Sequence, residues 1–480
     1  MNLVDFLFET KDPDKESVYF NGVHYTRKDI YGKILFTAGK IRSRIRHGER
    51  VGLVADNSVF FIASYLGIIE AGGVCVPLYP GSGKDYLRDT LTRSGARIVF
   101  AEEKHLNKIE GFDILTEKDI EGHSDKKHAS GEIDDCALIL FTSGSTAKPK
   151  GVMLSNKNLI CNTRSIVDYL RLDGHNRILA TLPFSYTFGL SWANASLRAG
   201  EKLVIDNKLV PAGKILTMIN KYKCTSFSGV PATFQLLLRT TDMKKMRFPT
   251  LRFVTQAGGK LQDALIKELI DALPNVDIFI MYGQTEASPR LSYLPPERLK
   301  DKLGSIGKGI PGTKLEVLNE SGYPVRPGEL GEIVATGDNI MLGYMDSPEE
   351  TEKVLRNGKL HTGDIATVDA DGFIYIADRA KNLIKARGFR ISPAEIENII
   401  LQMPDIIEAM ISGLPDELAG ESIKADIVSK NPQITDKEII DHCRKFLPPY
   451  KIPSKINFVQ EISKTPYGKP VKIAPGDIYG

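Results

Sequence analysis

Cysteine is scarce in this chain, and no cysteine or histidine pattern suggests a metal site or a disulfide framework. The five cysteines are odd in number, widely spread and never spaced Cys-x-x-Cys. The eight histidines form no His-Glu-x-x-His or His-x-His pair. From these absences we expect a reducing compartment, no structural zinc and no protein-ligated transition metal.

Long apolar runs, a basic leader and a surplus of one charge are also missing. The most apolar stretch, residues 59–69, is too short to span a bilayer and is followed by Glu70, so we expect a buried helix there. The acidic start lacks the basic region and apolar core of a signal peptide. The 63 basic and 60 acidic residues leave a net charge of +3, which argues against a nucleic-acid groove. We therefore predict a cytoplasmic protein with no transmembrane segment and no nucleic-acid partner.

The chain has 480 residues, which is too long for one ordinary core and predicts at least two domains. Short apolar runs alternate with helical segments up to about residue 310, which indicates a layered α/β body with mostly parallel sheets. Beyond that point, Pro-Gly and Ser-Gly turns separate short strands, and a hairpin is expected around Asp371-Gly372. A helix is then expected to begin, with Ser392 as its N-cap and Pro393 in its first position. The domain boundary is expected near residues 378–381.

The segment FTSGSTAKPKG, residues 141–151, is the first candidate for chemistry. It follows a run typical of a buried strand, and ligands of open α/β sheets bind in such loops. Its hydroxyl and backbone N–H groups suit phosphate oxygens, and Lys148 or Lys150 would neutralise their charge. The spacing differs from a Walker P-loop, because Pro149 precedes Lys150 and Gly151 follows it. Taken alone, the segment is equally typical of a surface turn.

Further motifs follow in order: LPFSYTFGLS (182–191), QAGGKL (256–261), MYGQTEA (281–287), a Thr-Gly-Asp segment (362–364) and SKTPYGKPVK (463–472). Together with the loop, they resemble the signature motifs of the adenylate-forming superfamily. That superfamily includes acyl- and aryl-CoA ligases, adenylation domains of peptide synthetases, and luciferases. The loop departs from the usual pattern at Ala147, where a glycine is usual. We expect this position to have an ordinary φ, because the other groups of the loop are kept.

The resemblance implies an α/β fold with two unequal domains. The large N-terminal adenylation domain, residues 1–380, would contain layered, mostly parallel sheets plus a β-barrel-like part. A small, mobile α+β C-terminal domain, residues 381–480, would rotate about a hinge at Lys381 between two half-reactions.

The resemblance also implies the reaction and its catalytic residues. A carboxylate would attack the α-phosphate of ATP, pyrophosphate would leave, and a thiol would take the acyl group from the acyl-adenylate. Two anions meet in the first step, so charge neutralisation dominates the catalytic need. By resemblance, Lys469 would bridge the carboxylate and the α-phosphate, Glu286 would bind Mg²⁺, and Thr285 would contact the α-phosphate.

The remaining site residues follow from the same motifs. Tyr282 would present its ring to adenine, Asp364 would bind the ribose hydroxyls, and Arg379 would support ribose or phosphate. The full ATP-binding set implied by the resemblance is Thr142, Ser143, Gly144, Ser145, Thr146, Lys148, Lys150, Gly258, Gly259, Tyr282, Gly283, Gln284, Asp364 and Arg379. After the domain rotation, a thiol tunnel would form with Lys385, Gly388 and Phe389.

The acid pocket is expected at Phe184, Tyr186, Thr187, Phe188 and Gly189. No acidic residue occurs from residue 182 to residue 197, so an α-amino acid is not expected. Tyr-Thr replaces the His-Asn pair that is frequent in aryl-acid relatives. This makes an aryl acid a weaker candidate for the substrate without excluding it. A hydrophobic acid, with a fatty acid favoured, is the first expectation.

The thiol acceptor and the class of the protein leave alternatives open. The sequence ends soon after Lys469, so we expect no fused carrier domain. Coenzyme A is favoured as the thiol, and a stand-alone acyl carrier protein is the alternative. A phosphotransferase releasing ADP, or a non-catalytic nucleotide- or acyl-binding protein, would belong to other classes. The presence of both Lys469 and Glu286 favours the enzyme.

Overall fold

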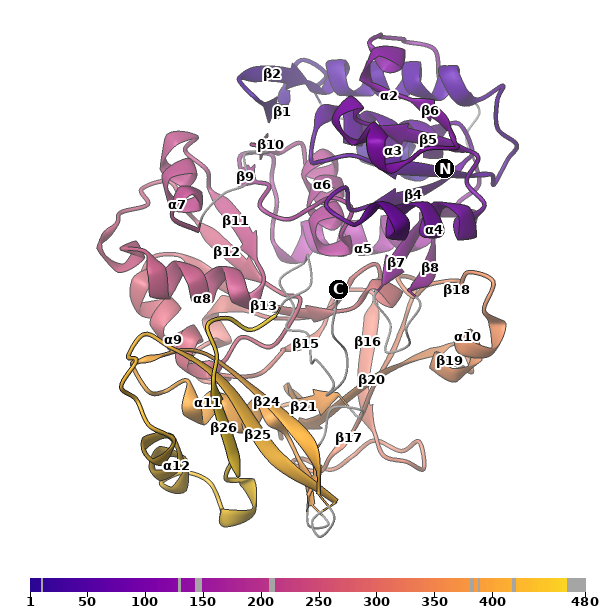
Figure 1. The fold of residues 1–480 in the computed structure, drawn as a ribbon. Coiled ribbons are helices and arrows are strands. Elements are labelled where there is room, and N and C mark those ends of the chain that lie inside the picture. Colours follow the sequence, from indigo (N-terminus) through magenta and orange to yellow (C-terminus); the bar gives the residue numbers. More distant parts are fainter. Residues whose placement is uncertain are drawn as a thin grey trace.

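The computed structural model describes residues 1–9, 12–127, 131–142, 149–206, 212–379, 384–386, 389–416 and 420–463. The N-terminal layers lie at one end of the molecule and the C-terminal strands at the other (Figure 1). Across the described ranges, no helix is long and apolar enough to cross a membrane.

One sheet is built around the strands on either side of the candidate phosphate-binding segment, residues 141–151, which is called the phosphate loop here. Its order is β18-β8-β7-β4-β3-β5-β6. The strands are β3 (Arg50–Val54), β4 (Val74–Leu78), β5 (Ile98–Ala101), β6 (Asp113–Leu115), β7 (Cys136–Thr142), β8 (Lys150–Ser155) and β18 (Gly343–Tyr344). Strands β3 to β7 pair in parallel, whereas β8 returns antiparallel to β7 and places Lys150 opposite Thr142. The phosphate loop therefore joins two antiparallel strands at the end of a parallel sheet.

A second sheet carries the later motifs. Its order is β15-β14-β13-β12-β11-β9-β10-β1-β2. The strands are β1 (Glu16–Phe20), β2 (Val23–Thr26), β9 (Arg177–Leu179), β10 (Lys202–Ile205), β11 (Ser226–Gly229), β12 (Phe253–Gln256), β13 (Asp277–Gly283), β14 (Arg290–Leu294) and β15 (Lys308–Gly309). The pairs from β1 to β13 are parallel, and β14 runs antiparallel to β13 with Arg290 opposite Gly283. The Tyr-Gly-x-Thr-Glu motif thus begins at the carboxyl end of a parallel strand.

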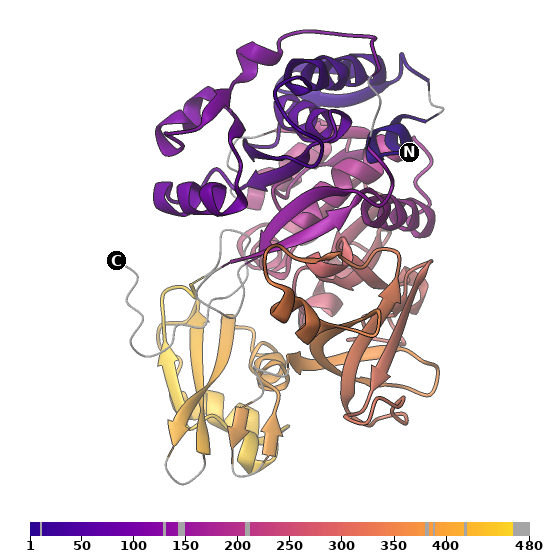
Figure 2. The same ribbon diagram turned by 90° about the vertical axis from the view of Figure 1, so that its right-hand side faces the viewer.

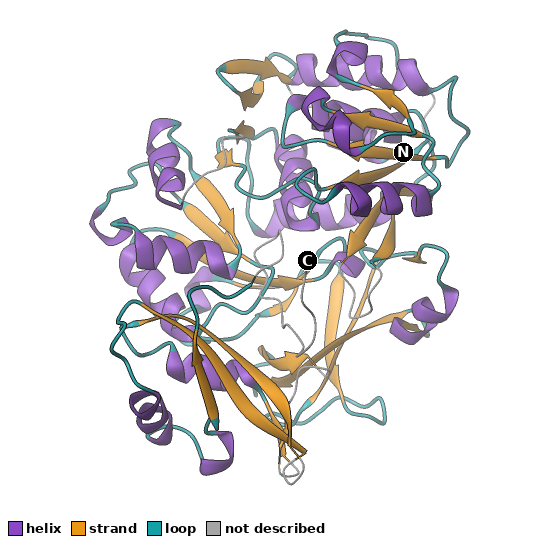
Figure 3. Cartoon of the chain, viewed as in Figure 1, coloured by secondary structure: helices purple, strands orange, loops and turns teal. Residues whose placement is uncertain are grey.

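Helices fill the space between the two sheets and cover their outer faces (Figure 3). α1 (Leu3–Phe8), α2 (Arg27–Ile41), α3 (Val59–Glu70), α5 (Asn156–Tyr169) and α6 (Thr187–Ala199) share one hydrophobic core with both sheets. Every residue of α3 is buried, which confirms the buried helix expected from its apolar sequence. Around these lie α4 (Lys84–Ser94), α7 (Ala212–Lys221), α8 (Pro231–Thr240), α9 (Asp263–Ala272), η1 (Glu103–Lys108), η2 (Glu117–Ile120), η3 (Met243–Lys245) and η5 (Pro296–Arg298).

An antiparallel sheet stands where the β-barrel-like part was expected. It contains β16 (Thr313–Leu318), β17 (Gly331–Gly337), β19 (Leu355–Arg356), β20 (Lys359–Val368) and β21 (Ile374–Arg379), and α10 (Pro348–Val354) precedes β19. β20 and β21 form the hairpin predicted around Asp371-Gly372. Its small core includes Tyr282, so this sheet packs directly against the end of β13.

The C-terminal part forms a small α+β unit with its own apolar core. It contains β22 (Ile384–Ala386), β23 (Phe389–Ile391), β24 (Ile406–Asp416), β25 (Gly420–Ser429), β26 (Lys455–Phe458), α11 (Pro393–Ile400), α12 (Asp436–Arg444) and η6 (Pro449–Lys451). Figure 2 shows this unit beside the antiparallel sheet. It contacts the large part through Gln262, whose Nε2 donates to Glu397 Oε2 at 3.4 Å. The fold confirms the predicted α/β architecture with a small C-terminal domain; the boundary at residue 380 stays a prediction.

The first helix of this unit begins where the sequence predicted it. Pro393 is the first residue of α11 and Ser392 precedes it. The Ser392 hydroxyl does not cap the helix; it donates to the backbone carbonyl of Ala377 at 2.6 Å. Ser392 therefore links the C-terminal unit to β21.

Candidate functional site

The predicted adenosine-binding residues Tyr282 and Asp364 meet in the structure. Tyr282 lies near the end of β13 and Asp364 lies on β20, and both are more than nine-tenths buried. The Tyr282 hydroxyl donates to Asp364 Oδ2 at 2.6 Å. A short bond of this kind to a buried carboxylate is strong, because the surroundings screen it weakly. Two motifs separated widely in the sequence are thus joined at one point.

A row of polar groups runs from Glu286 toward the phosphate loop. Glu286 lies in η4 (Thr285–Ala287), and its Oε1 accepts a hydrogen bond from the Tyr344 hydroxyl at 2.8 Å. The Lys150 ammonium stands 4.9 Å from the centroid of the Tyr344 ring and 2.5 Å from Glu350 Oε2. Hydrogen bonds from Lys150 and then Lys353 lower the pKa of Glu350 to about 2. The row places one cation and the expected magnesium ligand beside the same tyrosine.

The segment that carries the predicted acid pocket, residues 182–191, is called the acid segment here. It contacts the Thr-Glu pair of the MYGQTEA motif through two hydroxyls. Thr187 is the first residue of α6, and its Oγ1 lies 3.0 Å from Oγ1 of Thr285. Tyr186 precedes the helix, and its hydroxyl lies 3.3 Å from the point where a Cβ on Gly258 would stand. Burial raises the pKa of Tyr186, against a lowering by the charge of Arg290. Segments around residues 187, 258 and 285 therefore share one site.

Two other residues of the acid segment have clear packing roles. Phe184 is buried and packs edge-on against Phe61 at a centroid distance of 5.6 Å, within the central core. Gly189 has no room for a side chain, because a Cβ there would lie 2.1 Å from the carbonyl oxygen of Pro183. These contacts fix the first turn of α6 and so set the position of the Thr187 hydroxyl.

The glycine-rich turn after β12 has the conformation that its sequence suggests. Gly258 has a φ of +88°, in the left-handed region that favours glycine. The carbonyl of Gly259 accepts a hydrogen bond from Gln256 Nε2 at 2.8 Å. A glycine at this position also lets the Tyr186 hydroxyl approach the turn.

Several predicted residues lie outside the described part of the structure. They are Ser143, Gly144, Ser145, Thr146, Ala147, Lys148, Lys381, Gly388 and Lys469. For Arg379, Lys385 and Phe389 only the backbone is described, in β21, β22 and β23. Their roles stay predictions. Thr142 and Gly283 end β7 and β13, and Gln284 immediately precedes η4.

The structure also adds residues that the sequence interpretation missed. Tyr344 and Glu350 belong to the polar row, and Arg290 lies under the acid segment with its Cζ 4.5 Å from the centroid of the Phe188 ring. Arg290 comes three positions after the last residue of the MYGQTEA motif, and that closeness was the available signal. Nothing in the local sequence distinguishes Tyr344 or Glu350 from surface residues.

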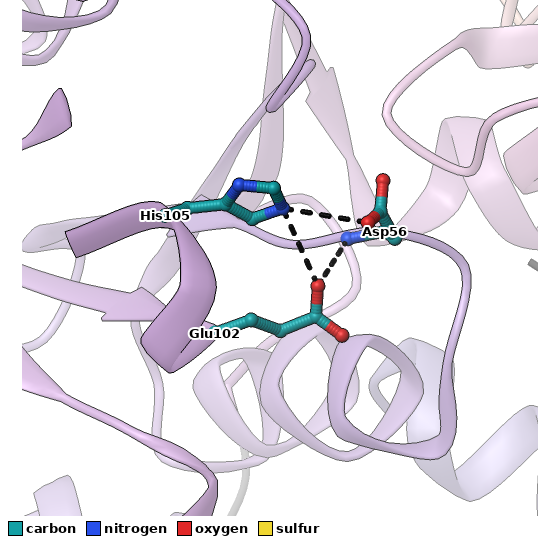
Figure 4. A group of neighbouring side chains, drawn as sticks. All are labelled: Asp56, Glu102 and His105. Atoms are coloured by element: carbon teal, nitrogen blue, oxygen red, sulfur yellow. Dashed lines mark hydrogen bonds and ion pairs between the residues drawn. The ribbon is translucent and has the colours of Figure 1, made fainter. Parts of the chain in front are cut away.

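A separate group of ionisable side chains joins the loop after β3 to η1 (Figure 4). Asp56, Glu102 and His105 offer ligand-type atoms within 4.8 Å of one another. Lys104 already bridges the two carboxylates, at 2.6 Å from Asp56 and 3.0 Å from Glu102. The backbone N–H of Asp56 also donates to Glu102 Oε2 at 2.9 Å. These contacts make the group a structural link between the two segments.

Comparison with known proteins identifies the family. The model of the AMP-binding enzyme family matches residues 8–345, and that of the AMP-binding enzyme C-terminal domain matches residues 395–469. A feruloyl-CoA synthase from an Amycolatopsis species is 29% identical over 96% of this chain and 95% of its own length. A long-chain-fatty-acid–CoA ligase from Bacillus subtilis is 30% identical over 95% of this chain and 90% of its own.

The fold agrees with the sequence comparison. An o-succinylbenzoate CoA synthetase from Bacillus subtilis, solved with its acyl-adenylate intermediate, superimposes with a TM-score of 0.89 at 25% identity. The superposition covers 100% of this chain and 98% of that one. The chain therefore belongs to the AMP-binding enzyme family, the adenylate-forming superfamily that its motifs predicted.

Proposed function

We propose that this chain is an AMP-forming acid–thiol ligase that activates a carboxylic acid with ATP and transfers the acyl group to coenzyme A. The observation that carries this proposal is the 3.0 Å approach of the Thr187 and Thr285 hydroxyls. It brings the start of the acid segment to the motif expected to hold the α-phosphate. Adenylate formation needs such a meeting point, because the carboxylate and the α-phosphate must come together there.

The described residues fit the nucleotide and its metal. The buried pair of Tyr282 and Asp364 supplies an aromatic face and a carboxylate, the groups that suit an adenine ring and ribose hydroxyls. Glu286 is held by the neutral hydroxyl of Tyr344, and no cation pairs with it among the described side chains. Its charge thus suits Mg²⁺, which prefers oxygen ligands and would neutralise phosphate charge when bound. Lys150 supplies a cation at the end of the phosphate loop.

The chemistry proceeds in two balanced steps. A carboxylate oxygen forms a bond to the α-phosphorus of ATP, and the bond from that phosphorus to the pyrophosphate oxygen breaks. The thiol sulfur then bonds to the acyl carbon as its proton is lost, and AMP leaves. Lys469 neutralises the two anions in the first step, and a rotation about Lys381 brings Lys385, Gly388 and Phe389 to the thiol in the second.

The acid is proposed to be hydrophobic, with a fatty acid as the first choice. The two phenylalanines of the predicted acid pocket, Phe184 and Phe188, support this choice because they belong to the central apolar core, and the fatty-acid–CoA ligase relative supports it as well. An aryl acid is the second candidate, supported by the feruloyl-CoA synthase relative. Coenzyme A is preferred over a separate carrier protein because both of these relatives are named for coenzyme A.

The test is pyrophosphate release from ATP and Mg²⁺ with a panel of short, long, aryl and amino acids. Hydroxylamine would trap the acyl-adenylate, and nucleotide analysis would identify AMP. Lys469→Ala should lower the rate of release strongly, whereas Lys472→Ala, which changes a nearby lysine outside the Gly-Lys pair, should leave it near the wild-type level. ADP as product, or no release with any acid despite ATP binding, would contradict the proposal.

A further inference from the structure

Arg290 is a buried cation beside the acid segment. It is the first residue of β14, and 2% of its surface is exposed. Its Nε donates to the Tyr169 hydroxyl at 3.3 Å, and its Cζ lies 4.5 Å from the centroid of the Phe188 ring. Its Nη2 is buried and has no hydrogen-bond partner among the residues that the structure describes. The guanidinium is therefore held at Nε by Tyr169 and on one face by Phe188. Its Nη2 donor has no partner among the described residues.

A buried guanidinium normally has a carboxylate or several carbonyl oxygens as partners, because removing a charge from water is costly. Within the described side chains, no carboxylate lies within 4.0 Å of Arg290. The carboxylate side chains outside that part are those of Asp378, Glu417 and Asp477. The partners that Arg290 does have, a hydroxyl and an aromatic ring, are both neutral.

Arg27 shows how this protein satisfies a structural arginine. It is also 2% exposed and also lies over a phenylalanine, with its Cζ 4.9 Å from the centroid of the Phe8 ring. Its Nη1 donates to the carbonyl of Leu197 at 2.5 Å and its Nη2 to the carbonyl of Leu7 at 3.0 Å. Both terminal nitrogens of Arg27 are thus used, in contrast to Nη2 of Arg290.

Arg290 adjoins the residues proposed to bind the acid. Phe188, which its guanidinium faces, follows directly on Thr187, whose hydroxyl contacts Thr285. The charge of Arg290 also acts on Tyr186, whose hydroxyl lies beside the Gly258 turn. Arg290 itself stands opposite Gly283 in the ladder of β13 and β14. It therefore lies behind the first turn of α6, next to the point where acid and α-phosphate are proposed to meet.

We propose that Arg290 binds a second carboxylate, carried at the far end of the acid that the enzyme activates. A guanidinium matches a carboxylate through two parallel N–H bonds, and Nη2 is available for one of them. The Phe188 ring adjoins the same guanidinium and suits an apolar or aryl spacer between the two carboxylates. The proposal rests on the function proposed above and narrows its hydrophobic acid to a dicarboxylic one.

The test compares acids that differ only in the second carboxylate. Octanoate against octanedioate, and benzoate against its carboxylated analogue terephthalate, would be titrated calorimetrically into the full chain. We expect the wild type to bind the diacid of at least one pair about 10- to 100-fold more tightly, the range for a hydrogen bond to a charged group. Arg290→Met should lose that preference while keeping its affinity for the monoacid, and Arg290→Lys should retain part of it.

Controls separate recognition from folding. Arg27→Met removes a comparably buried arginine and should lower the melting temperature without changing the diacid preference. If Arg290→Met does not fold, Arg290→Lys and Arg290→Gln serve the same comparison. Equal wild-type affinity for monoacids and diacids would overturn the proposal. If Arg290→Met lost affinity for monoacids and diacids equally, the proposal would also be overturned, because Arg290 would then hold the reacting carboxylate.

Pyrophosphate release with the same acids distinguishes this inference from the function on which it rests. Release with monoacids that is as efficient as with diacids would overturn the role of Arg290 and leave the ligase intact. A diacid preference in binding, without pyrophosphate release from any acid, would support the Arg290 site and contradict the ligase.

Discussion

The proposed nucleotide side and the proposed acid side of the site are built differently. On the nucleotide side, each motif residue has a partner within the protein: Tyr282 bonds to Asp364 at 2.6 Å, and Glu286 bonds to Tyr344 at 2.8 Å. On the acid side, Arg290 is buried with a donor that no described residue uses. The described groups on the proposed nucleotide side are thus paired within the protein, whereas the proposed acid side keeps a donor for a ligand.

This difference follows from what each side must recognise. ATP and Mg²⁺ present the same groups in every turnover, so fixed protein contacts can preorganise the residues around them. On the proposed function, the acid is the substrate that the enzyme must select, and a polar group that serves this selection stays unpaired until the correct acid binds. Such a group discriminates strongly, because a substrate lacking the matching atom leaves it buried and unpaired.

The largest expected effect concerns the chemistry shared by the two sides. Lys469→Ala should lower pyrophosphate release by about 100- to 1,000-fold, because it removes the charge that stabilises two approaching anions. Binding of ATP and of the acid should change much less, as calorimetry on the same variant would check. A rate within about tenfold of the wild type would mean that another cation, such as Lys150, supplies this charge.

A second prediction tests whether Glu286 belongs to the nucleotide side through a metal. Glu286→Gln should lower the rate of adenylate formation by about tenfold or more and raise the Mg²⁺ concentration needed for half-maximal activity. Tyr344→Phe removes only the supporting hydrogen bond at Oε1 and should have a smaller effect in the same direction. An unchanged Mg²⁺ dependence in Glu286→Gln would remove this residue from the metal site.

A third prediction concerns the buried hydrogen bond between Tyr282 and Asp364 on the proposed nucleotide side. Tyr282→Phe removes the hydroxyl that donates to Asp364 Oδ2. The loss of this buried hydrogen bond should lower the free energy of unfolding by about 1–3 kcal/mol. The KM for ATP should rise as well. Tyr375→Phe, which removes a half-buried tyrosine bond to Asp369 at 3.2 Å, is the matched control. Equal stability losses in chemical denaturation would contradict a special role for the buried pair.

The smallest effect is expected at the edge of the site, between Lys150 and Glu350. Hydrogen bonds from Lys150, the larger contributor, and from Lys353 lower the folded-state pKa of Glu350 from 4.5 to about 2, so these contacts stabilise the fold above pH 4.5 and are lost as the pH falls toward 2. Glu350→Gln should therefore lower the melting temperature slightly at pH 7. The difference in melting temperature between Glu350→Gln and the wild type should become smaller below pH 4.5. A difference that does not change with pH would contradict this ion pairing.

Local sequence was enough to predict much of the architecture. The continuous apolar runs became β7, β12 and β13, and the apolar stretch at residues 59–69 became the buried α3. The Asp-Gly turn gave the hairpin of β20 and β21. These features depend on local patterns of apolar and turn residues, which a sequence displays directly.

The tertiary contacts of the site were harder to predict. Asp364 and Tyr282 were each assigned to the nucleotide from a motif, but their bond joins positions 82 residues apart. The burial of Arg290 depends on the packing of β14 against α5 and α6, and a sequence does not show which arginine is enclosed. Ser392 illustrates the same limit, because its hydroxyl bonds to Ala377 and not to its own helix.

The most direct test of the proposed function follows an isotope. A substrate acid labelled with ¹⁸O in its carboxylate would be turned over with ATP, Mg²⁺ and coenzyme A, and the AMP would be analysed by mass spectrometry. An acyl-adenylate passes one carboxylate oxygen to AMP when the thiol displaces it, so one ¹⁸O atom is predicted in the phosphate of AMP. Unlabelled AMP, or label in inorganic phosphate with ADP as the nucleotide product, would contradict adenylate formation.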